Sequence, residues 1–105
     1  MTPRITAAAV IVLSISLAGL SFAQGSTADI YKTKCAMCHG ADGKGKTPIG
    51  PKLGVRDFHS PEVAKESDHM LFDITKNGKN KMPAYNGKLT DDQIRDLVKY
   101  IRSLK

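Results

Sequence analysis

The pentapeptide at residues 35–39, Cys-Ala-Met-Cys-His, constrains the fold of this 105-residue chain more than any other stretch. It has the C-x-x-C-H spacing that attaches a c-type haem. On a helix, Cys35, Cys38 and His39 stand at positions i, i+3 and i+4 and therefore share one face. Two thiols on one face can form thioether bonds to the two vinyl groups of one porphyrin, with the imidazole beneath the iron. The motif predicts one covalent haem c on Cys35 and Cys38, with His39 as an iron ligand.

Three other interpretations of the pentapeptide stay open. A C-x-x-C pair can be a thioredoxin-like redox centre, but that motif follows a strand in a βαβ pattern, and the sequence shows no such pattern. It can be half of a structural zinc site, but the chain has no further cysteine, and His59 and His69 lack a zinc-finger spacing. In an exported chain the pair can also form a simple disulfide.

The first 23 residues have the organisation of a secretory signal peptide. Arg4 gives a short basic start, an apolar run follows, and residues 21–23 place small side chains before a cleavage site. An uncleaved membrane anchor is the alternative, but the apolar run is marginal for spanning a bilayer, which usually takes about 20 residues. We therefore expect a signal peptide at 1–23, a single domain at 24–105 and a periplasmic location.

The size and charge of the predicted mature chain exclude some functions. It carries 15 Lys and Arg, since Arg4 leaves with the leader, against 10 Asp and Glu. These basic residues are spread along the chain without a nucleic-acid-binding motif, so nucleic acid is not an expected partner. A chain of this size can build only a small core, and a covalent porphyrin would supply the missing apolar mass.

Helical periodicity and capping residues predict an all-α domain. A first helix runs from about Thr27 into the haem motif, and Ala28 and Tyr31 lie on its apolar face. Many Gly and Pro residues make 41–59 a loop, long enough to wrap a flat cofactor. Two short helices then start at the Ser-Pro and Ser-Asp pairs of 60–61 and 67–68.

The last helix is the clearest element in the sequence. Thr90 and Gln93 form a T-x-x-Q capping box, and an apolar stripe follows on one face. This stripe needs a partner, and the first helix provides one. We expect these two helices to cross, with Leu97 and Tyr100 against Tyr31.

Met82 is an apolar side chain in a polar loop, and Pro83 keeps it out of helical conformation. A thioether held in this way can be the second axial ligand of the iron. The alternative is a methionine that fills a gap in the core. His59 and His69 are rival ligands, although a surface or capping role suits each better, and Met70 is expected to pack against the haem or the core.

The segment Gly-Pro-Lys-Leu at 50–53 follows the haem motif at a useful distance. The carbonyl of Pro51 is a candidate acceptor for the Nδ1 proton of His39, which would leave Nε2 free for iron. An ordinary Gly-Pro turn is the alternative.

Taken together, C-A-M-C-H-G, G-P-K-L, N-G-K-N-K-M-P-A-Y and the last helix resemble the small bacterial class I, monohaem cytochromes c. The resemblance covers nearly all of the predicted mature chain. It implies a cytochrome c fold, with three to five short helices and loops wrapped round one covalently bound haem and with crossing terminal helices. By match, Cys35 and Cys38 carry the thioethers, His39 is the proximal ligand, Met82 is the distal ligand, and Pro51 offers its carbonyl to His39.

The resemblance implies a soluble, monomeric single-electron carrier that cycles Fe(III)/Fe(II) between redox partner proteins and is not an enzyme. Membrane contact is expected only through partner complexes. Lysines beside the motifs could surround an exposed haem edge and steer partners with acidic docking patches; they are Lys44, Lys46, Lys52, Lys79 and Lys81.

Two other functions stay open. One is a haem-bearing electron-transfer subunit of a larger oxidase or dehydrogenase complex. The other is a peroxidase-like enzyme in which Met82 leaves the iron.

Overall fold

The computed structural model describes residues 2–3, 11 and 26–105. Within them the chain forms six α-helices, and the only β-pairing is two isolated bridges. The all-α class is therefore confirmed, with one helix more than the predicted upper limit of five. The helices are α1 (Thr27–Lys34), α2 (Ala36–His39), α3 (Gly50–Leu53), α4 (Pro61–Lys65), α5 (Asp68–Asn77) and α6 (Asp91–Ser103).

The predicted signal peptide at 1–23 lies almost entirely outside the described residues. Among those that are described, no helix is long and apolar enough to cross a membrane.

The first predicted helix is divided at Cys35 into α1 and α2. The Cys35 N–H still donates to the Tyr31 carbonyl, at 2.9 Å, and the Cys35 carbonyl accepts the N–H groups of Cys38 and His39. Hydrogen bonding thus continues across the division. Gly40 then ends α2 with a φ of 81°, which a glycine adopts without steric cost.

The predicted loop at 41–59 contains the short helix α3, so the loop prediction is wrong at 50–53. Pro51 lies in the first turn of α3, where the missing N–H costs no hydrogen bond. Gly54 ends the helix in the left-handed conformation, with a φ of 68°. A single helical turn between glycines is too short to produce a recognisable apolar period, which is why the pattern did not reveal it.

The caps of the last three helices confirm the sequence analysis. Ser60, Ser67 and Thr90 each accept a hydrogen bond from the backbone N–H three residues later. At α6 the side chain of Gln93 also accepts from the Thr90 N–H, at 2.8 Å, which completes the capping box.

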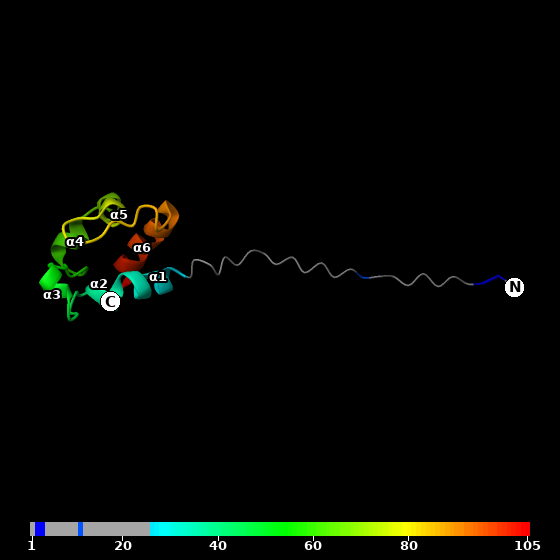
Figure 1. Cartoon of the computed structure of the whole chain (residues 1–105), viewed down its shortest axis with the longest axis horizontal. Helices are drawn as coiled ribbons and strands as arrows, with labels where there is room; N and C mark the ends of the chain where they lie inside the picture. The colour runs from blue at the N-terminus through cyan, green and yellow to red at the C-terminus, as the bar shows by residue number, and fades with distance from the viewer. Residues whose placement is uncertain (1, 4–10, 12–25) are drawn as a thin grey trace.

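The first and last helices lie side by side, as α1 and α6 do in Figure 1. Tyr31 and Leu97 are buried together with Ile30, and the rings of Tyr31 and Tyr100 lie 5.1 Å apart. The predicted crossing is confirmed, but the prediction that Ala28 contributes is wrong, because Ala28 is exposed. Ile30 takes its place, since it offers much more apolar area for burial.

A second small cluster lies between α4, α5 and α6, and consists of Val63, Leu71 and Val98. Phe58 and Ile101 pack against both clusters and so connect them. The two clusters make a thin apolar interior, as expected for a chain this short.

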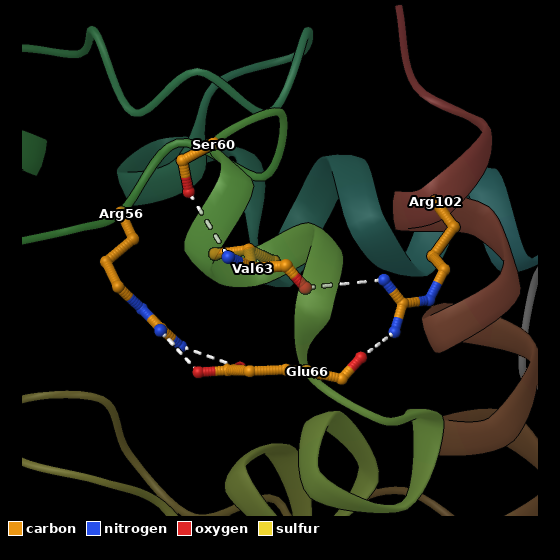
Figure 2. Close-up of polar contacts among 5 residues, drawn as sticks. All are labelled: Arg56, Ser60, Val63, Glu66 and Arg102. Carbon is orange, nitrogen blue, oxygen red and sulfur yellow. Dashed lines mark hydrogen bonds and ion pairs between the residues drawn. The ribbon is translucent and has the colours of Figure 1, made fainter.

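The short helix α4 is held from both sides by arginines (Figure 2). The Arg56 guanidinium makes two parallel hydrogen bonds to the Glu66 carboxylate, at 2.5 and 3.0 Å. Arg102, which belongs to α6, donates to the carbonyls of Val63 and Glu66 and pairs with Asp68 at 2.7 Å. The Val63 carbonyl also accepts the Glu66 N–H at 3.1 Å, so Arg102 adds a second donor there and supplies a donor to the Glu66 carbonyl. Arg102 thereby ties the end of α4 to α6.

The Arg56–Glu66 pair gives a pH-dependent prediction. The hydrogen bond and charge of Arg56 lower the pKa of Glu66, so its contribution to stability is present above the unfolded pKa, about 4.3, and is lost as the pH falls through the folded pKa. Glu66→Gln should lower the free energy of unfolding by about 1 kcal/mol at pH 7. The difference from the wild type should close below roughly pH 4.

Urea unfolding of the haem-loaded proteins between pH 7 and pH 3 measures this effect. The matched control is Glu62→Gln in α4, because Glu62 is a carboxylate close to Arg56 that forms no ion pair within residues 26–105, so the control removes a nearby charge without removing a hydrogen-bonded pair. A loss from Glu66→Gln that stays constant over this pH range would contradict the prediction.

Candidate haem site

We call residues 27–39, which form α1 and α2, the α1–α2 arm. A cavity of about 260 Å³ lies between this arm, α5, α6 and the loop that follows α5. Tyr31 and Leu97 of the first core cluster line it, as do Val63, Leu71 and Val98 of the second. The apolar interior of the protein therefore continues directly into the cavity wall.

Four of the five predicted site residues line this one cavity. Cys35, Cys38 and His39 come from the α1–α2 arm, and Met82 comes from the loop after α5. Both cysteines are free thiols and partly buried. The fold thus brings the Met82 thioether to the two thiols and the imidazole of the haem motif, from which it is far apart in the sequence. Pro51 does not line the cavity.

The end of the haem motif is held by the loop that follows it. The Thr47 hydroxyl donates to the Cys38 carbonyl at 2.9 Å, and the Gly45 N–H donates to the His39 carbonyl at 2.7 Å. These bonds satisfy carbonyls that the end of α2 would otherwise leave without partners. The loop therefore fixes the motif through its backbone.

The start of α3 approaches the haem motif very closely. The Gly50 N–H donates to the Thr47 hydroxyl at 2.8 Å. A Cβ atom at Gly50 would collide with the Gly45 carbonyl oxygen and lie only 2.7 Å from that of Cys38. This position needs glycine for space rather than for backbone conformation.

The Tyr31 hydroxyl makes a third contact with the motif, because it donates to the Gly40 carbonyl at 2.5 Å. Burial raises the pKa of Tyr31, so its phenol stays protonated and keeps this donor at neutral pH. Tyr31 thus packs in the core through its ring and holds the motif through its hydroxyl.

The His39 side chain is prepared for metal ligation. Its ring stacks on Phe58, with 4.6 Å between the centroids and 20° between the planes. Burial lowers the pKa of His39, and the nearby Arg56 charge lowers it further. Both effects favour the neutral imidazole, which is the form that binds iron.

The predicted hydrogen bond from His39 to Pro51 is not formed. His39 Nδ1 is buried and has no hydrogen-bond partner among the described residues. The Pro51 carbonyl accepts the Gly54 N–H at 3.3 Å, at the end of the helix α3. Pro51 acts here as a helix-starting residue.

The rival ligands lie elsewhere. Met70 is 49% exposed, so the prediction that it packs against the haem or core is wrong. Neighbouring residues of a helix point in different directions, and in α5 it is Leu71 that faces the core. His59 Nε2 lies 2.8 Å from the Asp42 carbonyl oxygen on the surface, and the exposed His69 lies 3.2 Å from a carboxylate oxygen one turn along α5. None of the three lines the cavity that Cys35, Cys38, His39 and Met82 share.

The sequence analysis gave no role to Arg56, Phe58 or Tyr85, which all line the cavity. The Tyr85 hydroxyl donates to the Lys34 carbonyl at 3.0 Å. Tyr85 carried a usable signal, because it is a large aromatic residue in the same polar loop as Met82. Arg56 carried none, since its pairing with Glu66 depends on how the intervening chain folds.

The exposed lysines divide into two groups. Of the five predicted around the haem edge, Lys79 and Lys81 line the cavity, together with Lys34. The other three lie on the surface away from it; they are Lys44, Lys46 and Lys52.

The structure argues against two of the alternative interpretations of the pentapeptide, the thioredoxin-like centre and the zinc site. The all-α fold lacks the strand that precedes a thioredoxin-like motif, within the part of the chain that is described. Burial raises the pKa of the Cys35 thiol to about 11, whereas reactive redox cysteines have lowered pKa values. The described residues also contain no cluster of three or more His, Cys, Asp or Glu that could hold a zinc ion. Paired thiols, a neutral buried imidazole and apolar walls fit a covalently attached haem.

The two glycines at the ends of α3 provide a matched test of the close approach. Gly50→Ala should lower the free energy of unfolding by about 3 kcal/mol, because the added methyl group meets backbone that cannot move aside. Gly54→Ala should cost only about 1 kcal/mol, since its Cβ would meet no atom within 4 Å and the penalty is conformational. Denaturant unfolding of both variants measures the difference, and equal losses would contradict the packing argument.

Comparison with known proteins agrees with this site. A family model described as cytochrome c oxidase, cbb3-type, subunit III matches residues 23–101. Cytochrome c6 of Thermosynechococcus vestitus is 29% identical over 91 residues, which are 87% of this chain and 79% of that protein. Cytochrome c6 of Parathermosynechococcus lividus is 31% identical over 74 residues, which are 70% of this chain and 82% of that protein.

A solved structure, titled KustC0563 c-type cytochrome, is 33% identical with a TM-score of 0.70 and covers 76% of this chain and 98% of its own. The chain belongs to the cytochrome c family: it is a small class I, single-haem cytochrome with a covalently bound haem c, and its function is electron transfer rather than catalysis.

Proposed function

We propose that this cytochrome is a freely diffusing, monomeric single-electron carrier whose haem iron is ligated by His39 and Met82. The observation that supports it most is the single cavity onto which Cys35, Cys38, His39 and Met82 all open. When bound, the haem supplies the one-electron Fe(III)/Fe(II) couple.

The residues of the α1–α2 arm hold the macrocycle and one face of the iron. Cys35 and Cys38 supply the two thioether sulfurs. His39 supplies a neutral imidazole, and the stacking on Phe58 together with the backbone bonds to Thr47 and Gly45 limits its movement. Little rearrangement of this arm is then needed when the charge at the site changes.

Met82 supplies the second ligand from the loop after α5. A thioether favours the reduced iron and raises the potential. The apolar walls around it act in the same direction, because burial penalises the extra charge of the oxidised centre. With both His39 and Met82 as protein ligands, the iron would keep no position for a substrate, which suits a carrier and not a peroxidase.

The chain's own residues also suggest where partners bind. Lys34, Lys79 and Lys81 are exposed and lie at the cavity, on the side through which an electron would pass. They would attract acidic docking patches on redox partners and guide brief encounters.

We further propose export to the periplasm, with residues 1–23 as a cleaved signal peptide and 24–105 as the mature protein. The basic start, the apolar run and the small residues at 21–23 support this. A second candidate function is a haem-bearing electron-transfer subunit of a larger oxidase or dehydrogenase complex. It is favoured by one observation, the description of the matching family model as an oxidase subunit.

The ligand assignment is tested by Met82→Ala. Removal of the thioether should lower the reduction potential by on the order of 100 mV or more and abolish the sulfur-to-iron charge-transfer band of the ferric protein. The matched control is Met70→Ala, because Met70 is exposed and away from the cavity; it should leave both properties unchanged. An unaltered potential in Met82→Ala would place the ligand elsewhere.

The docking surface is tested by electron transfer to a small acidic redox protein. The transfer rate should fall several-fold as the ionic strength rises, because salt screens the attraction between exposed charges. Lys79→Gln with Lys81→Gln should lower the rate at low salt and flatten its salt dependence. Lys44→Gln with Lys46→Gln, away from the cavity, is the control. Rates that do not change with salt would contradict the proposed surface.

A further inference from the structure

The loop at 79–85 is attached to the rest of the protein mainly through α5. Its Tyr85 N–H donates to the Thr75 carbonyl at 3.1 Å, and within the loop Lys79 and Met82 exchange backbone hydrogen bonds of 3.2 and 2.9 Å. These bonds shape the loop and join it to α5. None of them joins it to the arm that carries the attachment cysteines.

The Tyr85 side chain makes that connection. Its hydroxyl donates to the Lys34 carbonyl at 3.0 Å, across 51 residues of sequence. Lys34 is the last residue of α1 and directly precedes Cys35. Among the described residues, no other hydrogen bond joins the loop at 79–85 to α1 or α2.

The bond to the Lys34 carbonyl lies at the surface, while the rest of the Tyr85 side chain reaches inward. The side chain is half-buried and lines the same cavity as Met82. Burial raises the pKa of Tyr85, so the phenol remains a donor at neutral pH. The Lys34 carbonyl lies in the last turn of its helix, where a carbonyl needs an outside partner.

We propose that Tyr85 is a positioning residue, whose hydroxyl ties the Met82 loop to the end of α1 and so keeps the Met82 thioether facing the cavity. The proposal rests on the proposed role of Met82 as an iron ligand. Conformations in which the loop swings away from the α1–α2 arm must break this bond. Its loss therefore raises the population of such open conformations, which an external ligand can capture.

Imidazole titration of the ferric, haem-loaded protein measures this population, because imidazole can bind only where Met82 has left. Binding is followed by the change in the Soret absorption of the haem, which reports on variants with and without the Met82 thioether. Tyr85→Phe keeps the ring and removes only the hydroxyl. We expect its imidazole dissociation constant to fall by roughly three- to tenfold, the range for one lost hydrogen bond.

Two control variants separate this local effect from others. Tyr100→Phe makes the same substitution in a tyrosine whose hydroxyl bonds to no described residue, and it should bind imidazole as the wild type does. Ser60→Ala removes the N-cap of α4, a helix that makes no hydrogen bond to the loop at 79–85 among the described residues, and lowers overall stability. It should also leave imidazole binding unchanged.

The results distinguish the two proposals. If Tyr85→Phe binds imidazole like the wild type, or if Ser60→Ala tightens binding as much, the positioning role of Tyr85 is overturned. Met82→Ala tests the ligand assignment in the same titration, since removal of the competing thioether should tighten imidazole binding far more than Tyr85→Phe does. If Met82→Ala also binds like the wild type, Met82 is not the ligand, and both proposals are overturned.

Discussion

The interior of this cytochrome and its cofactor site share one wall, and the rest of the structure depends on this. Both small core clusters, centred on Leu97 and Val98 of α6, line the cavity that Cys35, Cys38 and His39 also face. A chain of this size buries too little apolar surface to be strongly stable alone. A haem anchored against that wall extends the core, so the residues that bind it also stabilise the fold.

The two sides of the cavity are held in different ways. On the His39 side, Thr47 and Gly45 bond the backbone of the motif directly, and Gly50 packs with no room for a side chain. On the Met82 side, a loop anchored to α5 reaches the cysteine arm through one tyrosine hydroxyl. The first arrangement is rigid because many backbone atoms are fixed together. The second depends on few contacts, so a single side chain has a large influence on it.

Much of the fold and most of the candidate site could be predicted from local patterns. The cap residues Ser60, Ser67 and Thr90 were identified because capping involves only three or four neighbouring residues. The crossing of α1 with α6 followed from apolar periodicity. The errors have a common cause. Ala28, Met70 and the turn of α3 were judged from sequence spacing alone, whereas their exposure and partners depend on how each element is oriented in the folded chain.

The sequence by itself determined the attachment chemistry, the helical class and the candidate ligands, since these depend on residue type and on spacing along a helix. Only the tertiary structure decided which side chains meet across long separations. The bond from Tyr85 to the Lys34 carbonyl spans 51 residues, and the Arg56–Glu66 pair and the tight approach at Gly50 arise only when the loops fold over the motif. Such contacts depend on the path of the backbone in three dimensions, and no local pattern encodes that path.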